Sequence, residues 1–391
     1  MPAKTMAALS LPALIAELKA RPSLADEPDV FYLSTTAYGE FSACMMRGNF
    51  HQNLRLVPKP RNLKTPMRNG IWIHSGVEQY HAHGDWGSAL DGLVVNAVEL
   101  GIEGAKIEEH RKKTERVLMG YMNHYWGKDK WKVLATELHV EWDTGTTIRI
   151  WEGGAWAKKR LVVGCTLDLL VDDPVYGVVI VEHKSTIEIP PPSWRVVDPQ
   201  TAIQALVCER VGIPVAGLIF NYLLTKDPSV PRFTKKDGTL YANSADFTTS
   251  KAWDKGIADA KEEHGGKFME GGETWRQYVD RERENHVNDD AFYQRHPILK
   301  PKGYLAEALR DLAMTCKGIS DASKSGHWRR SYHTISCRRF CTYSDLCMAE
   351  YQRGGRPATV LREADFILDD GTREGDTAWA KYGRLLMETE D

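Results

Sequence analysis

Gly-Cys-Thr-Leu-Asp-Leu-Leu at residues 164–170 and Val-Val-Ile-Val-Glu-His-Lys-Ser at residues 178–185 form the strongest structural signal in the chain. Both stretches are apolar and prone to form β-strands. The Pro and Gly of residues 172–177, which lie between them, suit a tight reversal. We therefore predict a β-hairpin here.

Charged residues interrupt both predicted strands. Because side chains alternate between the two faces of a strand, Glu182 and Lys184 point the same way and His183 points to the other side. If Asp168 on the first strand shares that face, two carboxylates and an ammonium group converge. Such a group suits a metal site with a charged partner.

The composition limits the possible classes of protein. With 391 residues, 42% of them hydrophobic, the chain can bury a sizeable core in one elaborated domain or one domain with a subdomain. The 51 basic and 53 acidic residues nearly cancel, so DNA contacts would need local basic patches. Neither a signal peptide nor an apolar run of roughly 18 residues is present, and we expect a soluble, cytoplasmic protein without a membrane partner.

The segments around the hairpin predict a mixed sheet. Residues 131–142 alternate as a strand, 143–145 suit a turn, and 146–151 suit its partner strand. Residues 198–207 begin a helix at Asp198 and Pro199, and the apolar run 217–224 is β-prone. The order hairpin, helix, strand favours a mixed α/β sheet.

Two further segments carry candidate ligands. The spacing of apolar residues predicts a helix over 70–81, which places His74, Glu78 and His81 on one adjoining face. Glu137, in the strand at 131–142, could approach the metal site, although glutamates on strands more often face solvent. Histidine is the commonest metal-binding side chain, which makes His74 a candidate ligand.

Cys337, Cys341 and Cys347 lie within eleven residues of one another. In a chain without a secretion signal, thiols at such spacing suit zinc or an iron–sulfur cluster better than disulfides. Both kinds of site want four ligands, and Cys44 is the natural fourth, with His333 as a competitor that would favour zinc. We expect the three remaining thiols, Cys165, Cys208 and Cys316, to be ordinary buried residues.

Residues 226–290 are rich in charge and Gly and lack a clear period, and we expect them to be an insertion. Aromatic residues alternate with cations at 275–278 and 292–296, as a groove for single strands would need. We divide the chain into an N-terminal helical extension (1–30), a main domain closed by the cysteines (31–350) and a C-terminal tail (351–391).

Taken together, these motifs resemble the RecB-like branch of the PD-(D/E)xK nuclease superfamily, in particular its iron–sulfur members such as CRISPR-associated and AddB-type nucleases. They occur in the family's order between residues 32 and 350. The matching residues are Cys44, the helix that carries His74, residues 164–168 with Asp168, Glu182-His183-Lys184, Gln200 or Gln204, and the closing triplet Cys337, Cys341 and Cys347.

The resemblance implies an α/β fold with a restriction-endonuclease-like mixed central sheet flanked by helices and a helical subdomain that holds a cluster. It implies that His74, Asp168 and Glu182, with the His183 carbonyl, hold Mg²⁺ or Mn²⁺. Lys184 would position or help deprotonate the attacking water; the alternative is a salt bridge to Glu182 on an exposed strand face. The family's glutamine, either Gln200 or Gln204 here, would orient Lys184 or that water.

The chain departs from the family pattern at two places. The aromatic residue that usually stands four positions after the motif glutamine is missing, because Gln200 is followed by Gln204 and Gln204 by Cys208. Three residues separate Cys337 from Cys341, where many relatives have two. The resemblance implies a 4Fe-4S cluster on the four cysteines, with Zn²⁺ as the alternative.

The function that the resemblance implies is a Mg²⁺- or Mn²⁺-dependent deoxyribonuclease, an exonuclease on DNA ends or single strands in recombination, repair or CRISPR adaptation. The alternative is a catalytically idle, cluster-stabilised DNA-binding subunit of a recombination or CRISPR-adaptation complex. The compact format without helicase motifs resembles phage-encoded or CRISPR-linked copies. A phage-encoded protein would work in the host cytoplasm, together with recombination or CRISPR-adaptation proteins.

Overall fold

The fold is that of a computed structural model. It describes residues 9–58, 65–84, 87, 90, 91, 94, 104–125, 127–152, 154–193, 198–225, 292–300, 303–331, 337, 341–354, 362, 363 and 366–368. The expected insertion at 226–290, the aromatic stretch at 275–278 and His333 lie outside the described residues.

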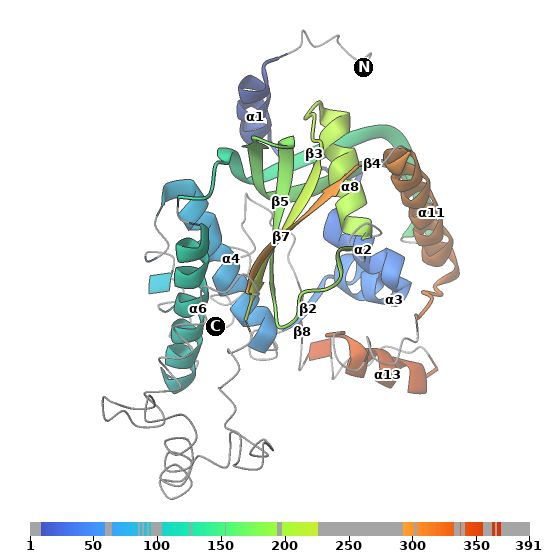
Figure 1. The fold of residues 1–391 in the computed structure, drawn as a ribbon. Helices are drawn as coiled ribbons and strands as arrows, with labels where there is room; N and C mark the ends of the chain where they lie inside the picture. Colours follow the sequence, from blue (N-terminus) through green and yellow to red (C-terminus); the bar gives the residue numbers. More distant parts are fainter. Residues whose placement is uncertain are drawn as a thin grey trace, which may run out of the picture.

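A six-stranded mixed sheet forms the centre of the molecule (Figure 1). Its strand order is β1-β4-β5-β6-β7, and β3 pairs with β4 in addition. The pairs β1/β4 and β5/β6 are parallel and the other pairs are antiparallel. The strands are β1 (Val30–Ser34), β3 (Lys132–Glu152), β4 (Ala155–Asp173), β5 (Gly177–Thr186), β6 (Gly217–Leu224) and β7 (Tyr293–Leu299).

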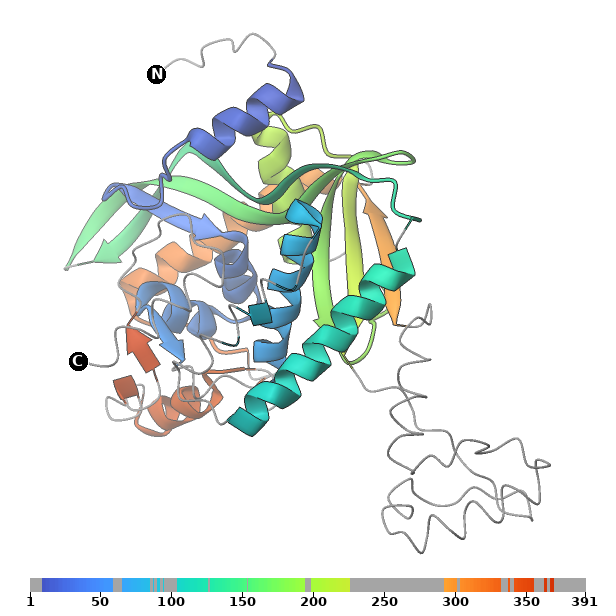
Figure 2. The same cartoon turned by 90° about the vertical axis from the view of Figure 1, so that its left-hand side faces the viewer.

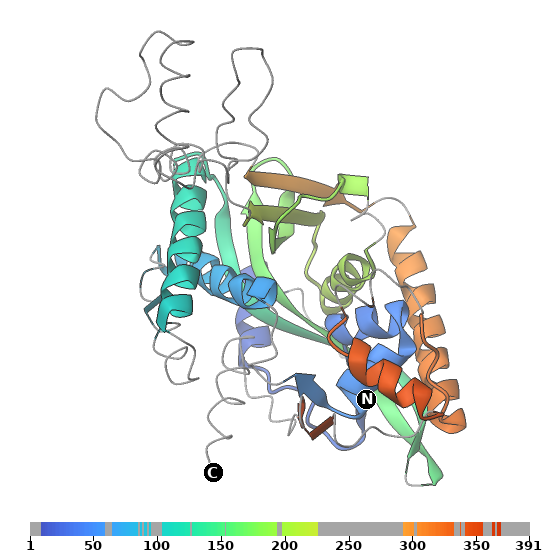
Figure 3. The same ribbon diagram turned by 90° about the horizontal axis from the view of Figure 1, so that it is seen from below.

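Helices cover both faces of this sheet, as the view from below shows (Figure 3). On one side α1 (Leu11–Ala20), α2 (Thr35–Ala43), α8 (Pro199–Val211) and α11 (Tyr304–Ser325) bury the main apolar core. On the other side α4 (Thr65–His83) and α6 (Gly104–Tyr125) bury a second core against β6 and β7. The expected mixed α/β fold with flanking helices is therefore confirmed at this level.

A smaller unit joins residues 45–58 to the C-terminal part of the described chain. The strands β2 (Leu56–Pro58) and β8 (Phe366–Leu368) pair antiparallel. The short helices α3 (Met45–Gly48) and α13 (Ser344–Gln352) and the π-helical turn η1 (Asn49–Asn53) complete it. Phe50, Tyr343 and Phe366 pack together in its apolar centre.

The predicted hairpin is confirmed as β4 and β5. Asp173 pairs with Gly177, and the Asp173 carboxylate accepts hydrogen bonds from the main-chain nitrogens of Val175 and Tyr176 at 2.7 and 2.9 Å. Gly177 has a φ of +75°, which glycine adopts without steric cost. The sequence-predicted helices at 70–81 and 198–207 and the strand at 217–224 are also confirmed, as α4, α8 and β6.

The expected reversal at 143–145 is wrong, because β3 is one long strand that pairs with β4 along its length. The register shifts between Asp143 and Thr147, so the turn-like residues form an irregularity in the strand and not a hairpin. The Asp143 carboxylate accepts a hydrogen bond from the main-chain nitrogen of Gly145 at 3.0 Å, which satisfies the local backbone. The chain reverses after Glu152 instead.

The sheet forks along β4, because β4 changes its partner from β1 to β5, and this fork positions the candidate site. On the edge away from β3, residues 160–164 of β4 pair with β1 and residues 169–173 pair with β5. Residues 165–168 lie between these two partners. Asp168 is therefore at the point where β5 meets β4. Its carboxylate can accept a hydrogen bond from the β5 backbone where the main-chain pairing of the two strands stops.

Candidate metal centre

Asp168 holds the fork together through its side chain. Its Oδ2 accepts a hydrogen bond from the main-chain nitrogen of His183 at 2.9 Å, just beyond the last ladder pair, Leu169 with Val181. The same oxygen lies 2.8 Å from Nε2 of His74 on α4. The Asp168 carboxylate thus connects β4 and β5 to α4.

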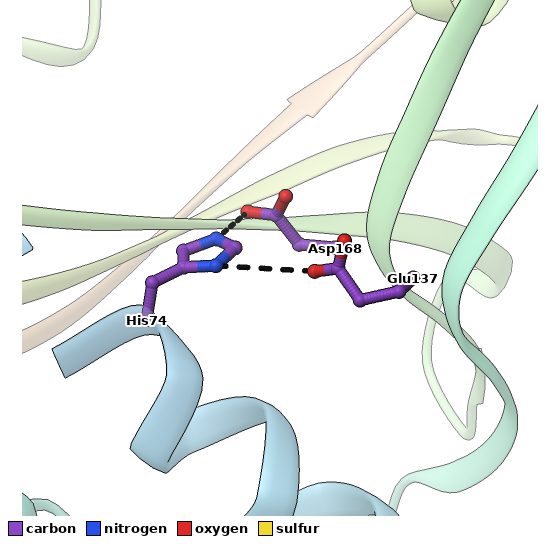
Figure 4. Close-up of side chains that lie close together, drawn as sticks. All are labelled: His74, Glu137 and Asp168. Atoms are coloured by element: carbon purple, nitrogen blue, oxygen red, sulfur yellow. Dashed lines mark ion pairs between the residues drawn. The ribbon is translucent and has the colours of Figure 1, made fainter. Parts of the chain in front are cut away.

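Glu137 on β3 completes a group of three side chains. Its Oε1 lies 3.8 Å from Nδ1 of His74, so the imidazole stands between two carboxylates (Figure 4). One possible ligand atom from each of His74, Glu137 and Asp168 falls within 4.8 Å of the others. The three residues come from α4, β3 and β4, which lie far apart in the sequence.

Glu137 lies opposite Asp168, between the pairs Thr136–Leu169 and Leu138–Leu167 of β3 and β4. Glu137 has a φ of +44°, in the left-handed region, which costs a residue with a Cβ about 1–2 kcal/mol. The register of β3 also shifts between Val133 and Ala135. Oε1 of Glu137 is buried without a hydrogen-bond partner among the described residues. Glutamates on strands more often face solvent, but the side chain of Glu137 points into the protein.

The three groups hold each other in unusual protonation states. Burial alone would lower the pKa of His74, but the facing Asp168 carboxylate outweighs burial and raises it to about 9. Burial also opposes ionisation of Asp168, yet His74 keeps the pKa of that carboxyl below its usual range. Burial, helped by the charge of Asp168, raises the pKa of Glu137 to about 8. At pH 7 the group contains an imidazolium, a carboxylate and a neutral carboxylic acid.

Glu182 and Lys184 share one face of β5, as the strand alternation predicts. Lys184 Nζ donates to Oε1 of Glu182 at 2.5 Å. Gln204 Nε2 donates to Oε2 of Glu182 at 3.0 Å, and Gln200 Nε2 lies 3.4 Å from Oε1. Both glutamines reach the same carboxylate because they are four residues apart on α8. Glu182 lies outside the group of three ligand atoms that lie within 4.8 Å of one another.

The side chain of His183 lies on the opposite face of β5 and packs inside the molecule. Its ring stacks on His81 of α4, with ring centroids 5.5 Å apart. Asn221 Nδ2 lies 2.8 Å from His183 Nδ1. Burial lowers the pKa of His183 well below its usual value, so the ring is neutral at pH 7. The main-chain nitrogen of His183 donates to Asp168, and its ring lies edge-on to the ring of His74, with centroids 6.0 Å apart.

A buried polar network contacts His183 through Asn221. The sequence did not reveal this network. Arg295 binds the Asp129 carboxylate through two nitrogens at 2.6 and 2.8 Å. The same guanidinium lies 3.4 Å from Oδ1 of Asn221 and 3.3 Å from the hydroxyl of Tyr121. These residues come from β7, β6, α6 and the loop before β3, and no sequence spacing links them.

Cys44 and the C-terminal cysteines lie in one region of the structure. Cys44 ends α2, and Cys44, Cys341 and Cys347 pack against the same apolar cluster. Burial raises the pKa of the Cys341 and Cys347 thiols, and nearby Cys44 and Cys337 raise both further. No three of the four sulfur atoms, all of them in the described residues, lie within 4.8 Å of one another. The metal or cluster that they hold remains a prediction.

The other three cysteines are buried, as expected: Cys165, Cys208 and Cys316. Arg330 Nε donates to the sulfur of Cys347 at 3.3 Å, which distinguishes that thiol from the buried ones. In the helices that the structure describes, none is long and apolar enough to cross a membrane.

Comparisons with known proteins add little to this description. No protein-family model matches the chain, and no curated protein matches it. A solved structure titled "Crystal structure of SSO0001" aligns with 86% of this chain and 93% of its own, at 12% sequence identity and a TM-score of 0.27. A likeness at that score carries no argument. The class that fold and site define is therefore a mixed α/β protein with a candidate histidine–carboxylate metal centre.

Proposed function

We propose that this protein is a divalent-metal-dependent DNA nuclease with a restriction-endonuclease-like fold. The observation that carries the proposal is the group of His74, Glu137 and Asp168, whose ligand atoms lie within 4.8 Å, at the same fork as the Glu182–Lys184 pair. A metal-binding group next to a carboxylate-bound lysine suits hydrolysis of a phosphodiester, whose transition state gains negative charge.

The donor set fits Mg²⁺ or Mn²⁺. Nitrogen and carboxylate oxygen suit these ions, and bonds of about 2.0–2.1 Å place neighbouring ligands about 3.0 Å apart and opposite ones about 4.2 Å apart. His74 and Asp168 are 2.8 Å apart and the whole group spans at most 4.8 Å, so small movements would close the site. The buried, unpartnered Oε1 of Glu137 is a further sign that a cation belongs here.

His74, Asp168 and Glu137 would hold the ion, together with Glu182 and the His183 carbonyl that the resemblance implies. When bound, such an ion lowers the pKa of water and neutralises charge on the scissile phosphate. Lys184, held at 2.5 Å by Glu182, would orient the attacking water and stabilise the negative charge that develops on the phosphate oxygens. Gln204 and Gln200 fix the Glu182 carboxylate and so the position of Lys184.

The cysteine region supports the second part of the proposal, a 4Fe-4S cluster on Cys44, Cys337, Cys341 and Cys347. Zn–S bonds of about 2.3 Å in a tetrahedron would place the sulfur atoms about 3.8 Å apart. Cys44 and Cys337 raise the pKa of the Cys341 and Cys347 thiols, but no three of the four sulfur atoms lie within 4.8 Å of one another. The hydrogen bond from Arg330 to Cys347 suits a thiolate that carries negative charge.

The substrate we propose is DNA with free ends or single strands, in recombination, repair or CRISPR adaptation. End-labelled single- and double-stranded DNA incubated with Mg²⁺ or Mn²⁺ tests this directly. We expect cleavage by the wild type and a loss of about 10²-fold or more in Lys184→Ala, which removes the cation beside the reacting phosphate.

Lys112→Ala, on the exposed surface of α6, is the matched control and should cleave like the wild type. DNA binding without cleavage under every metal condition would contradict the proposal and favour the idle DNA-binding subunit. Equal cleavage rates for Lys184→Ala and the wild type would show that this site takes no part in the reaction.

A further inference from the structure

The far end of the β3–β4 ribbon has a feature that the proposed nuclease site does not use. Beyond Arg160, where β1 begins to pair, β3 and β4 pair with each other alone among the described strands. This two-stranded ribbon projects past the sheet beside α11, at the left in Figure 2. Along it, Arg149 lies opposite Lys158 and Trp151 lies opposite Trp156.

Strand alternation divides the ribbon into a buried and an exposed face. Ile148 and Ile150 point toward α11 and belong to the main core. Arg149, Trp151, Trp156 and Lys158 share the other face, and all four are exposed. We call these four residues the tryptophan ladder.

The two tryptophans are adjacent and both are exposed to solvent. Trp151 and Trp156 are 37% and 40% exposed, and their rings meet edge to face with centroids 5.4 Å apart. Lys324 of α11 places its ammonium group 5.6 Å from the centre of the Trp156 ring. Two adjacent exposed indoles with cations around them are more typical of a binding surface than of a free protein surface.

The charges on the ladder are not balanced within the chain. Arg149 and Lys158 stand directly opposite each other, and like charges in that position destabilise a strand pair. Neither forms an ion pair with an acidic side chain in the part of the chain that the structure describes. The nearby Glu152 pairs with Lys159 on the opposite face. An anionic partner would relieve this repulsion.

We propose that the tryptophan ladder binds single-stranded nucleic acid. Indole rings stack on bases of any sequence, and flanking cations contact the phosphates. Acidic residues at the base of the ribbon, Glu27, Asp29 and Asp143, surround Arg160 and would repel phosphates there. The bound nucleic acid therefore crosses the tip of the β3–β4 ribbon and does not run along its length.

The ladder is separate from the candidate metal centre. Trp151 follows Glu137 by 14 residues on β3, and it lies past Arg160, where β3 and β4 pair alone, whereas Asp168 lies where β5 meets β4. A nucleic acid strand bound at the ladder would contact a different part of β3 and β4 from the metal centre. The inference does not rest on the nuclease proposal, because binding at the ladder needs no metal.

Fluorescence anisotropy of the full chain with a labelled oligothymidylate tests the inference, in EDTA so that no cleavage can occur. About 20 nucleotides suffice, since single-strand modules cover roughly 4–16. We expect Trp151→Ala and Trp156→Ala each to weaken binding about fivefold to hundredfold, and Trp→Phe at either position to retain most of it. The intrinsic tryptophan fluorescence of the wild type should fall as the oligonucleotide binds.

The double variant Arg149→Gln/Lys158→Gln should reduce the slope of log affinity against log salt by about 1.4, or about 0.7 for each cation removed. Lys112→Gln on α6 is the control and should bind like the wild type, and thermal unfolding should show that every variant is folded. Wild-type affinity in the alanine variants would overturn the inference, even if the charge variant binds weakly. Tryptophan-dependent binding to phosphatidylserine vesicles with unchanged oligonucleotide binding would overturn it in favour of a membrane surface.

Discussion

The candidate metal centre and the cysteine region both join segments that lie far apart in the chain, but they differ in how far the protein alone assembles them. At the metal centre, His74 and Asp168 are already 2.8 Å apart and form an ion pair. In the cysteine region the thiols are near one another without close contact between three sulfur atoms. Burial keeps the protons on Cys341 and Cys347 there.

This difference follows from what each region contains without its ion. In the metal centre a protonated imidazole occupies the position between two carboxyl groups, so the protein supplies its own cation. In the cysteine region Arg330 donates to Cys347, yet burial still raises the pKa of the Cys341 and Cys347 thiols. Four thiolates together would therefore need a metal or cluster to compensate their charge. We therefore expect the metal centre to persist without its ion and the cysteine region to depend on its cluster for stability.

The largest expected effect is that of Asp168→Asn on DNA cleavage. The substitution removes a charged ligand and the partner of His74, and we expect a loss of about 10³-fold or more in cleavage rate with Mn²⁺. Absorption near 400 nm should be unchanged, because the cysteine region is not affected. A variant that cleaves at more than a tenth of the wild-type rate would show that Asp168 is not a ligand in the reaction.

Cys347→Ser tests the other region. Protein purified without oxygen should contain iron and sulfide and absorb broadly at roughly 400 nm, and the variant should lose most of both. It should also unfold at a lower temperature, because the proposed cluster would join α2 to α13. Cys316→Ala, a buried thiol outside the set, should keep its iron. Colourless wild-type protein with one equivalent of zinc would contradict the iron–sulfur assignment.

Glu137→Gln tests whether β3 contributes to the metal centre. Removing one charged ligand should weaken Mn²⁺ binding, measured by calorimetry, about tenfold to hundredfold. Glu109→Gln on the exposed face of α6 should bind Mn²⁺ like the wild type. Unchanged affinity in Glu137→Gln would mean that its left-handed backbone serves another purpose.

The smallest effect is on the pH dependence of stability in the absence of metal. The pKa of His74 is raised to about 9, so its contribution is complete below about 6.5 and is lost as the pH rises through 9. The pKa of Glu137 is raised to about 8, so the folded state also loses stability as the pH rises through 8. The unfolding temperature should therefore fall between pH 7 and 9.

Two comparisons make this pH measurement decisive. The fall should be smaller in His74→Gln/Glu137→Gln, which lacks both titrating groups. Mn²⁺ affinity should rise over the same pH range, because the ion must displace protons from both residues. A flat unfolding temperature between pH 7 and 9 in the wild type would show that the two groups are not coupled as the structure indicates.

Local pattern in the sequence predicted the elements correctly where they depend on neighbouring residues. Strand alternation placed Glu182 and Lys184 together, and the helix over 70–81 placed His74 on its polar face. It failed at residues 143–145, where the same turn-like residues can either reverse a chain or interrupt a strand. The length of β4 decided between them, since β4 offers a partner along the whole of β3.

The sequence by itself determined which residue types are available for chemistry: His74, Asp168, the Glu182–Lys184 pair, two glutamines and four cysteines in order. Only the tertiary structure decided which of them meet. Glu137 joins His74 and Asp168 because the register of β3 on β4 sets it opposite Asp168, between the pairs Thr136–Leu169 and Leu138–Leu167. Gln200 and Gln204 both reach Glu182 because α8 packs across β5, and a helix presents residues four apart on the same face. Spacing along a chain defines faces, but packing defines which faces come into contact.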